Sequence, residues 1–159
     1  MTLALGHTVV LLNDDALHLP PDMLGLPEAA RVIVAGRSLL RMTLAELSHP
    51  GAEIVWTDFR QSASLSALHG AVQSAGGLDR MILAADGEQS EAMFALMCAV
   101  LTLLPALRRR AGARVDLVVE GGRAVSSLDQ FVDRLRPRLE MDGITLAVQV
   151  VERRVEAAA

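Results

Sequence analysis

The chain has 159 residues, of which 52% are hydrophobic and 21% are charged, and its net charge is −4. This composition predicts one globular domain over residues 1–159, with a short flexible tail at 154–159, and excludes a disordered chain. The net negative charge argues against nucleic acid as a partner. No apolar run reaches the roughly 20 residues of a membrane span, and no secretory signal precedes the domain. We therefore expect a cytoplasmic protein without membrane contact.

Two residue types that are common in catalysis are absent from the sequence. All 15 basic side chains are arginine, and there is no tyrosine. A proton relay that needs a phenol, or a step that needs a side-chain amine, is therefore excluded. The single cysteine, Cys98, rules out an intramolecular disulfide, and the four scattered histidines offer no pair at metal-binding spacing. We expect no metal site.

Six short apolar runs, bounded by polar residues or glycine, are typical of fully buried strands. They lie at residues 9–12, 32–35, 54–56, 81–84, 115–119 and 144–151. Near-continuous apolar strands favour a parallel sheet that is covered on both faces.

Helical periodicity lies between these strands, in segments that follow Gly36, Ser64, Ser90 and Ser127. Gly76-Gly77 and Gly143 are expected to end two of the helices, and Pro137 to kink or shorten the last one. The alternation of strand and helix predicts an α/β fold with a single doubly wound Rossmann-like domain. Its sheet should be mostly parallel, with about six strands and helices on both faces.

The order of these segments resembles the short-chain dehydrogenase/reductase family, which is Rossmann-type and NAD(P)-dependent, from about Thr8 to Arg153. Residues 31–37, Arg-Val-Ile-Val-Ala-Gly-Arg, resemble the family's second strand with its trailing Gly-Arg. Residues 78–85, Leu-Asp-Arg-Met-Ile-Leu-Ala-Ala, resemble its fourth-strand motif, and Asp58 stands where the family has an adenine-contacting aspartate. The resemblance implies a degenerate, C-terminally truncated relative.

The same resemblance implies that the family's chemistry is lost. Gap-free counting from Arg37 puts the family's phosphate-binding glycines at Asn13, Leu17 and Leu19, where side chains would fill the phosphate space. The family's Tyr-x-x-x-Lys motif cannot occur, so its Tyr/Lys-dependent dehydrogenase mechanism is excluded. We therefore expect a pseudoenzyme with no catalytic residues and no cofactor. Residual NAD(P) binding would use Arg37 for a phosphate and Asp58 for the adenine amine.

The apolar excess points to protein association as the function, most simply in a homodimer, with a heteromeric partner as a further possibility. The resemblance implies dimerisation through the helices at about 90–110 and 127–140. Residues 91–107 are apolar nearly all round, so the sheet would cover one side of that helix and a partner copy the other. The interface candidates are Met93, Phe94, Met97, Val100, Leu101, Leu104, Phe131 and Leu135.

A rival interpretation uses the acidic residues that follow apolar strands, namely Asp14, Asp15, Asp86 and Glu120. The carboxyl ends of parallel strands meet at one edge of a sheet, and ligands bind there. The chain would then be a small-molecule or nucleotide binder, or an enzyme whose mechanism differs from that of the family.

Overall fold

The computed structural model describes residues 7–12, 31–37, 42–43, 51–86, 90–120 and 126–151. Six strands form one sheet in the order β3-β2-β1-β4-β5-β6, and every neighbouring pair is parallel. The strands are β1 (His7–Leu12), β2 (Arg31–Gly36), β3 (Glu53–Trp56), β4 (Arg80–Asp86), β5 (Arg114–Glu120) and β6 (Thr145–Val151). The predicted strand number and parallel sheet are thus confirmed.

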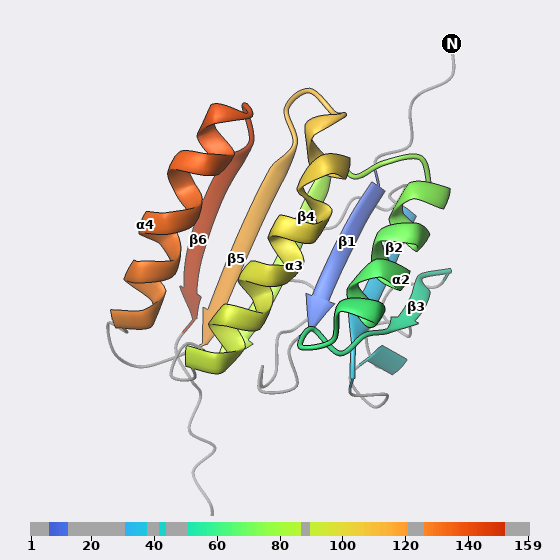
Figure 1. The fold of residues 1–159 in the computed structure, drawn as a ribbon, viewed down its shortest axis with the longest axis horizontal. Coiled ribbons are helices and arrows are strands. Elements are labelled where there is room, and N and C mark those ends of the chain that lie inside the picture. Colours follow the sequence, from blue (N-terminus) through green and yellow to red (C-terminus); the bar gives the residue numbers. More distant parts are fainter. Residues whose placement is uncertain are drawn as a thin grey trace, which may run out of the picture.

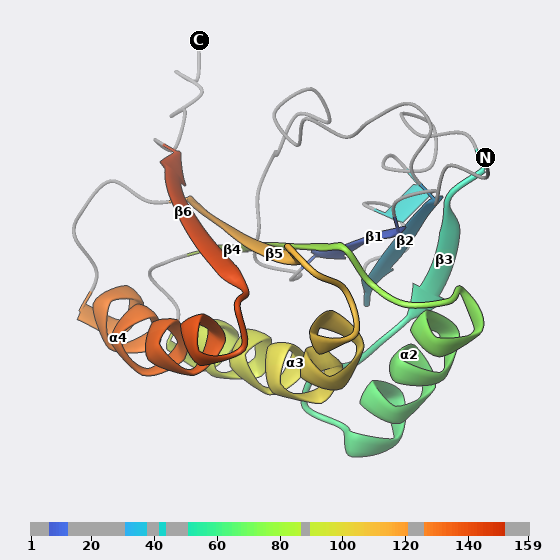
Figure 2. The same ribbon diagram turned by 90° about the horizontal axis from the view of Figure 1, so that it is seen from above.

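Three long helices lie side by side on one face of this sheet (Figure 1, Figure 2). They are α2 (Ser62–Ser74), α3 (Ser90–Arg108) and α4 (Ser126–Met141). The central helix, α3, packs between the other two, and Arg136 ties α4 to the edge strand by donating from Nη1 to the carbonyl of Leu146 at 3.4 Å. None of the described helices combines the length and apolar character needed to cross a bilayer.

The core forms because successive side chains of each strand point to opposite faces of the sheet. The side chains of β4 and β5 that join the core under the helices are Met81, Leu83, Val115, Leu117 and Val119. Residues between them face the other way, yet Ile82, Ala84 and Val118 are at most 5% exposed. Both faces of the central strands are therefore buried, as the continuous apolar runs predict.

The glycines that the sequence marks as helix ends have a backbone that most other residues avoid. Gly76 follows α2 with a φ of 94°, and Gly143 follows α4 with a φ of 72°. At the second of these ends, the N–H of Ile144 donates to Leu139 and the N–H of Gly143 donates to Glu140, both at 3.0 Å. This bond pair is a Schellman motif, and it satisfies carbonyls that the helix leaves open.

Of the two effects expected of Pro137, a kink or a shorter helix, the shortening does not occur, since α4 continues to Met141. Pro137 and Asp133, four residues earlier, are both exposed. Water can therefore satisfy the carbonyl that loses its partner to the proline, and the helix tolerates the ring.

Candidate functional site

The strand order reverses at β1, which lies between β2 and β4. In doubly wound sheets, ligands bind at the carboxyl ends of the strands at such a switch point. The residues that follow β1 lie outside the described part of the chain. The predicted phosphate-turn positions Asn13, Leu17 and Leu19, and the acidic residues Asp14 and Asp15, are therefore without a structural account.

Arg37 and Asp58 lie close together beside this switch point. Arg37 directly follows β2, Asp58 lies just beyond β3, and Nη1 of Arg37 is 3.9 Å from Oδ2 of Asp58. The carboxylate is also fixed from its own loop, because Oδ1 accepts the backbone N–H of Arg60 at 3.0 Å. The arginine side chain is 40% exposed and the aspartate 13%. The two residues that the sequence selected thus share one corner of the sheet.

The backbone around this corner is tightly paired. The N–H of Thr57 donates to the carbonyl of Gly36 at 2.9 Å, which continues the pairing of β2 and β3 beyond the last strand residues. The side chain of Thr57 turns back onto the carbonyl of Val55 at 3.1 Å, and the residue is fully buried. Hydrogen bonds of Thr57 therefore hold the backbone next to Asp58 in place, although Asp58 lies beyond the end of β3.

Trp56 is a residue of this corner that the sequence did not single out. It ends β3, is 52% exposed, and is the only tryptophan of the chain. Residues 54–56 were expected to be a buried strand, and this is wrong: β3 is an edge strand whose residues are exposed or half-buried. An edge strand has one neighbour fewer to cover it, and sequence periodicity does not show which strand takes the edge.

Two of the four acidic residues that follow apolar strands are neighbours in the sheet. Asp86 ends β4, Glu120 ends β5, and the two are register partners in the sheet. Their backbones therefore lie next to each other at the carboxyl edge, as the sequence predicted.

The predicted association surface is smaller than the sequence suggested. Phe94 is 64% exposed, Leu101 is 40% exposed, and Met97 is half-buried. The other candidates with a described side chain belong to the core of this chain at 3% exposure or less, and these are Val100, Leu104, Phe131 and Leu135. This corrects the prediction for these four residues: helical periodicity turns them toward the sheet and the neighbouring helix. The side chain of Met93 lies outside the described residues.

A single parallel sheet in this order, with helices between its strands, defines the Rossmann class of doubly wound domains. Comparison with solved structures narrows the fold to that of the short-chain dehydrogenases. Neither a protein-family model nor a curated protein matches the sequence.

Three solved structures illustrate this likeness. A short-chain dehydrogenase from Streptomyces avermitilis has a TM-score of 0.65 and 16% identity, over 99% of this chain and 75% of its own. A short-chain oxidoreductase from Pseudomonas aeruginosa PAO1, described as containing an atypical catalytic center, has a TM-score of 0.68 and 17% identity, over 87% and 66%. BdcA in complex with NADPH has a TM-score of 0.58 and 18% identity, over 90% and 68%. The chain thus spans about two thirds to three quarters of these neighbours.

The expectation that the chain is no enzyme is wrong. The neighbours of its fold are named dehydrogenases or oxidoreductases, and one of them has an atypical catalytic center. The physical reason is that missing tyrosine and lysine remove one proton relay, whereas other side chains can move a proton.

Proposed function

We propose that the chain is a nucleotide-binding domain of the short-chain oxidoreductase type, and that Arg37 and Asp58 hold the adenosine end of NADP(H). The observation that carries the proposal is the 3.9 Å contact between these side chains at the neighbouring ends of β2 and β3. A guanidinium is suited to a phosphate, and a carboxylate can accept a hydrogen bond from the adenine amine. BdcA, which shares the fold, was solved with NADPH.

The geometry of the corner is compatible with such a ligand. The separation of 3.9 Å between Nη1 of Arg37 and Oδ2 of Asp58 is longer than a direct hydrogen bond, so this contact is an ion pair without a short bond. Trp56 offers an exposed aromatic face close by in the chain, on which a base can stack. Arg37 then favours the 2′-phosphorylated dinucleotide over NAD(H), because only the former brings a phosphate to this end.

When bound, NADP(H) would supply the hydride of the reaction. This chain would have to supply the proton from a group other than tyrosine or lysine. We propose the acidic carboxyl edge as its source, because Asp86 and Glu120 end adjacent strands there.

Nucleotide binding can be measured through the fluorescence of Trp56, which has no other tryptophan or tyrosine to obscure it. We expect NADPH to quench this emission and to bind more tightly than NADH. Arg37→Gln should weaken NADPH binding about 10-fold to 100-fold, the value of a charge-assisted hydrogen bond, and leave NADH binding unchanged. Arg109→Gln is the matched control, because this exposed arginine follows α3, far along the chain from the corner.

Two results would refute the proposal. One is the absence of both quenching and a thermal shift at millimolar NADPH and NADH. The other is an Arg37→Gln variant that discriminates between the two nucleotides as the wild type does.

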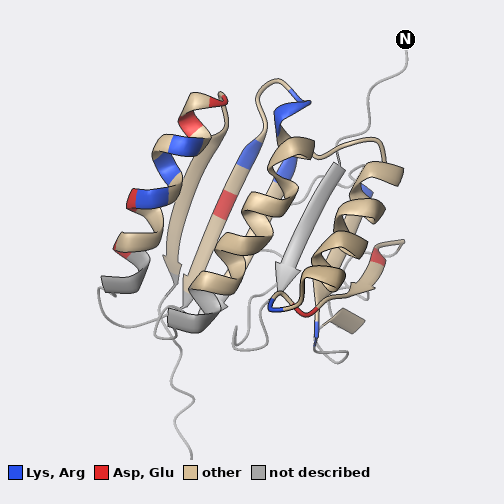
Figure 3. Ribbon diagram, viewed as in Figure 1, with Lys and Arg blue, Asp and Glu red and all other residues tan. Residues whose placement is uncertain are grey.

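A second candidate function is self-association through α3. The sequence has no charged residue between 92 and 107, and the coloured part of α3 is tan over this stretch in Figure 3. Phe94, Met97, Leu101 and Pro105 recur at helical spacing and are exposed or half-buried, and we call them the α3 strip. Contiguous apolar surface of this kind commonly marks an interaction site. A second copy is the simplest partner, because a twofold axis would set the strip against itself.

Light scattering coupled to size exclusion tests this association. We expect a dimer for the wild type and a monomer, or an insoluble protein, for Leu101→Arg and Met97→Glu. Met141→Arg is the control, because Met141 is 87% exposed at the end of α4 and lies outside the α3 strip. A monomeric wild type, or an unchanged dimer of Leu101→Arg, would count against the interface.

A further inference from the structure

The strand β6 forms one edge of the sheet, and β3 forms the other. The N–H of Thr145, the first residue of β6, donates to the carbonyl of Ala113, the residue before β5, at 3.1 Å. Backbone groups of successive strand residues point to opposite sides, so every second residue from Thr145 points toward β5. The residues between them point outward, away from the sheet, and these are Leu146, Val148 and Val150.

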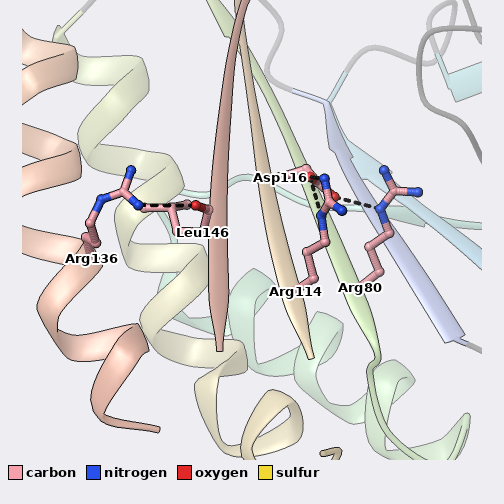
Figure 4. A network of polar contacts seen from close by, with 5 residues as sticks. All are labelled: Arg80, Arg114, Asp116, Arg136 and Leu146. Atoms are coloured by element: carbon pink, nitrogen blue, oxygen red, sulfur yellow. Dashed lines mark hydrogen bonds and ion pairs between the residues drawn. The ribbon is translucent and has the colours of Figure 1, made fainter. Parts of the chain in front are cut away.

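Arg136 covers only one end of this outer edge. Its Nη1 donates to the carbonyl of Leu146 at 3.4 Å (Figure 4). Among the described residues, none forms a hydrogen bond with the outward backbone groups of Val148 and Val150. Unpaired backbone groups on an edge strand are a template for another strand. The part of the edge that can accept a partner is therefore the segment from Val148 to Val150.

The two valines of this segment are exposed, although they lie on the face of the sheet that carries the core. Val148 is 36% exposed and Val150 is 58% exposed. Their register partners on β5, Leu117 and Val119, belong to the core under the helices. Figure 2 shows the C-terminal end of β6 turning away from α4, which explains this exposure. An apolar row thus extends from the core to the rim of the sheet.

The sequence of β6 does not protect this edge. Edge strands are usually protected by charge, by proline or by their shortness, and β3 has four residues and begins with the exposed Glu53. In contrast, β6 has seven residues, none of which is charged or proline. A strand without charge does not repel a copy of itself, and the amide of Gln149 carries both donors and an acceptor. These features favour a second copy of this chain as the partner strand.

We propose that two copies of the chain pair through β6, antiparallel, about a twofold axis at Gln149. Val148 of one copy then exchanges both backbone hydrogen bonds with Val150 of the other, and their side chains lie together on the core face. A register centred on Val148 would instead need the carbonyl of Leu146, which Arg136 occupies.

This contact is separate from the nucleotide site and from the α3 strip, because α3 packs between α2 and α4 and not at the sheet edge. A strand edge is smaller than a standard interface, so we expect a dissociation constant of about 0.1–1 mM. At micromolar concentration the contact is open, and it does not alter the masses expected for variants of the α3 strip.

Cross-linking at the axis tests this register on the full chain. Cα atoms of a non-hydrogen-bonded pair are about 4.5 Å apart, within the range of about 4.4–6.8 Å that a disulfide spans. Gln149→Cys, oxidised with diamide at about 0.5 mM protein, should therefore form a covalent dimer. Thr145→Cys is the matched control, because Thr145 is exposed on the same face but lies about 25 Å from its own copy in this register. The wild type measures any cross-linking through Cys98.

Variants of the two valines decide whether strand pairing causes the cross-link. Val150→Pro removes an outward N–H but no bond to β5, so it should keep the circular dichroism of the wild type. In the Gln149→Cys background it should slow cross-linking about 10-fold. Val148→Lys should also slow it, and the addition of Val150→Glu should restore it, because opposite charges then face each other across the axis. The proposal is overturned if Gln149→Cys cross-links no faster than Thr145→Cys, or if Val150→Pro and Val148→Lys both leave its rate unchanged.

Discussion

Substitution of Asp116 by asparagine should destabilise the chain in a way that the two arginines can reveal. The substitution keeps the shape of the side chain but removes the negative charge that accepts from Arg80 and Arg114 at 2.6 and 2.7 Å. Loss of one partner of a buried ion pair costs about 3–5 kcal/mol, whereas an exposed pair is worth about 1 kcal/mol or less. Because Arg80 is 26% and Arg114 51% exposed, the value must lie between these limits.

We expect Asp116→Asn to lower the free energy of unfolding by about 2–3 kcal/mol, which corresponds to about 5–10 °C in the unfolding temperature. Urea unfolding, monitored by circular dichroism, measures it. Arg114→Gln should lower the free energy of unfolding of the wild type. In the Asp116→Asn background the same substitution should leave this free energy unchanged or raise it, because it then removes a positive charge that Asp116 no longer compensates. Asp116 does not compensate the two arginines if Asp116→Asn stays within about 0.5 kcal/mol of the wild type, or if Arg114→Gln costs the same in both backgrounds.

Glycine and core substitutions give further expected outcomes. Gly143→Ala should lower the free energy of unfolding by about 1–2 kcal/mol. A Cβ at this position would meet no atom within 4 Å, so the cost comes only from the backbone, whose φ of 72° is unfavourable for alanine. Gly70→Ala is the control, because Gly70 lies within α2 and also has open space around its Cα. This variant should raise the free energy of unfolding, measured with urea, by about 0.5–1 kcal/mol. Equal effects of the two alanines would show that the positive φ of Gly143 is not the cause. Leu103→Ala should cost about 3–5 kcal/mol, since Leu103 is fully buried in α3; a loss below about 1 kcal/mol would show that α3 does not pack as described.

Much of the fold could be predicted because its signals are local. Apolar runs of strand length mark β1 to β6, and Gly76 and Gly143 mark helix ends through a backbone requirement that the sequence itself carries. The family resemblance then aligned Arg37 with the end of β2 and Asp58 with the end of β3. Arg37 does directly follow β2, and Asp58 lies just beyond β3, as this alignment predicted.

The features that could not be predicted depend on neighbours that are distant in sequence. Trp56 is exposed because β3 takes the edge of the sheet. Val100 and Leu104 cannot be told from Phe94 and Leu101 by residue type, since all are apolar; only packing decides which of them face the core.

The sequence by itself determined the alternation of strands and helices, the parallel sheet, and the exclusion of a Tyr/Lys proton relay, because composition and periodicity act within short segments. Only the tertiary structure decided which apolar side chains remain on the surface and which arginines share Asp116. Arg80 lies 36 residues from Asp116, and sheet register alone brings them together. The physical reason is that a strand's own residues set its propensity, whereas its neighbours in the sheet set the environment of each side chain.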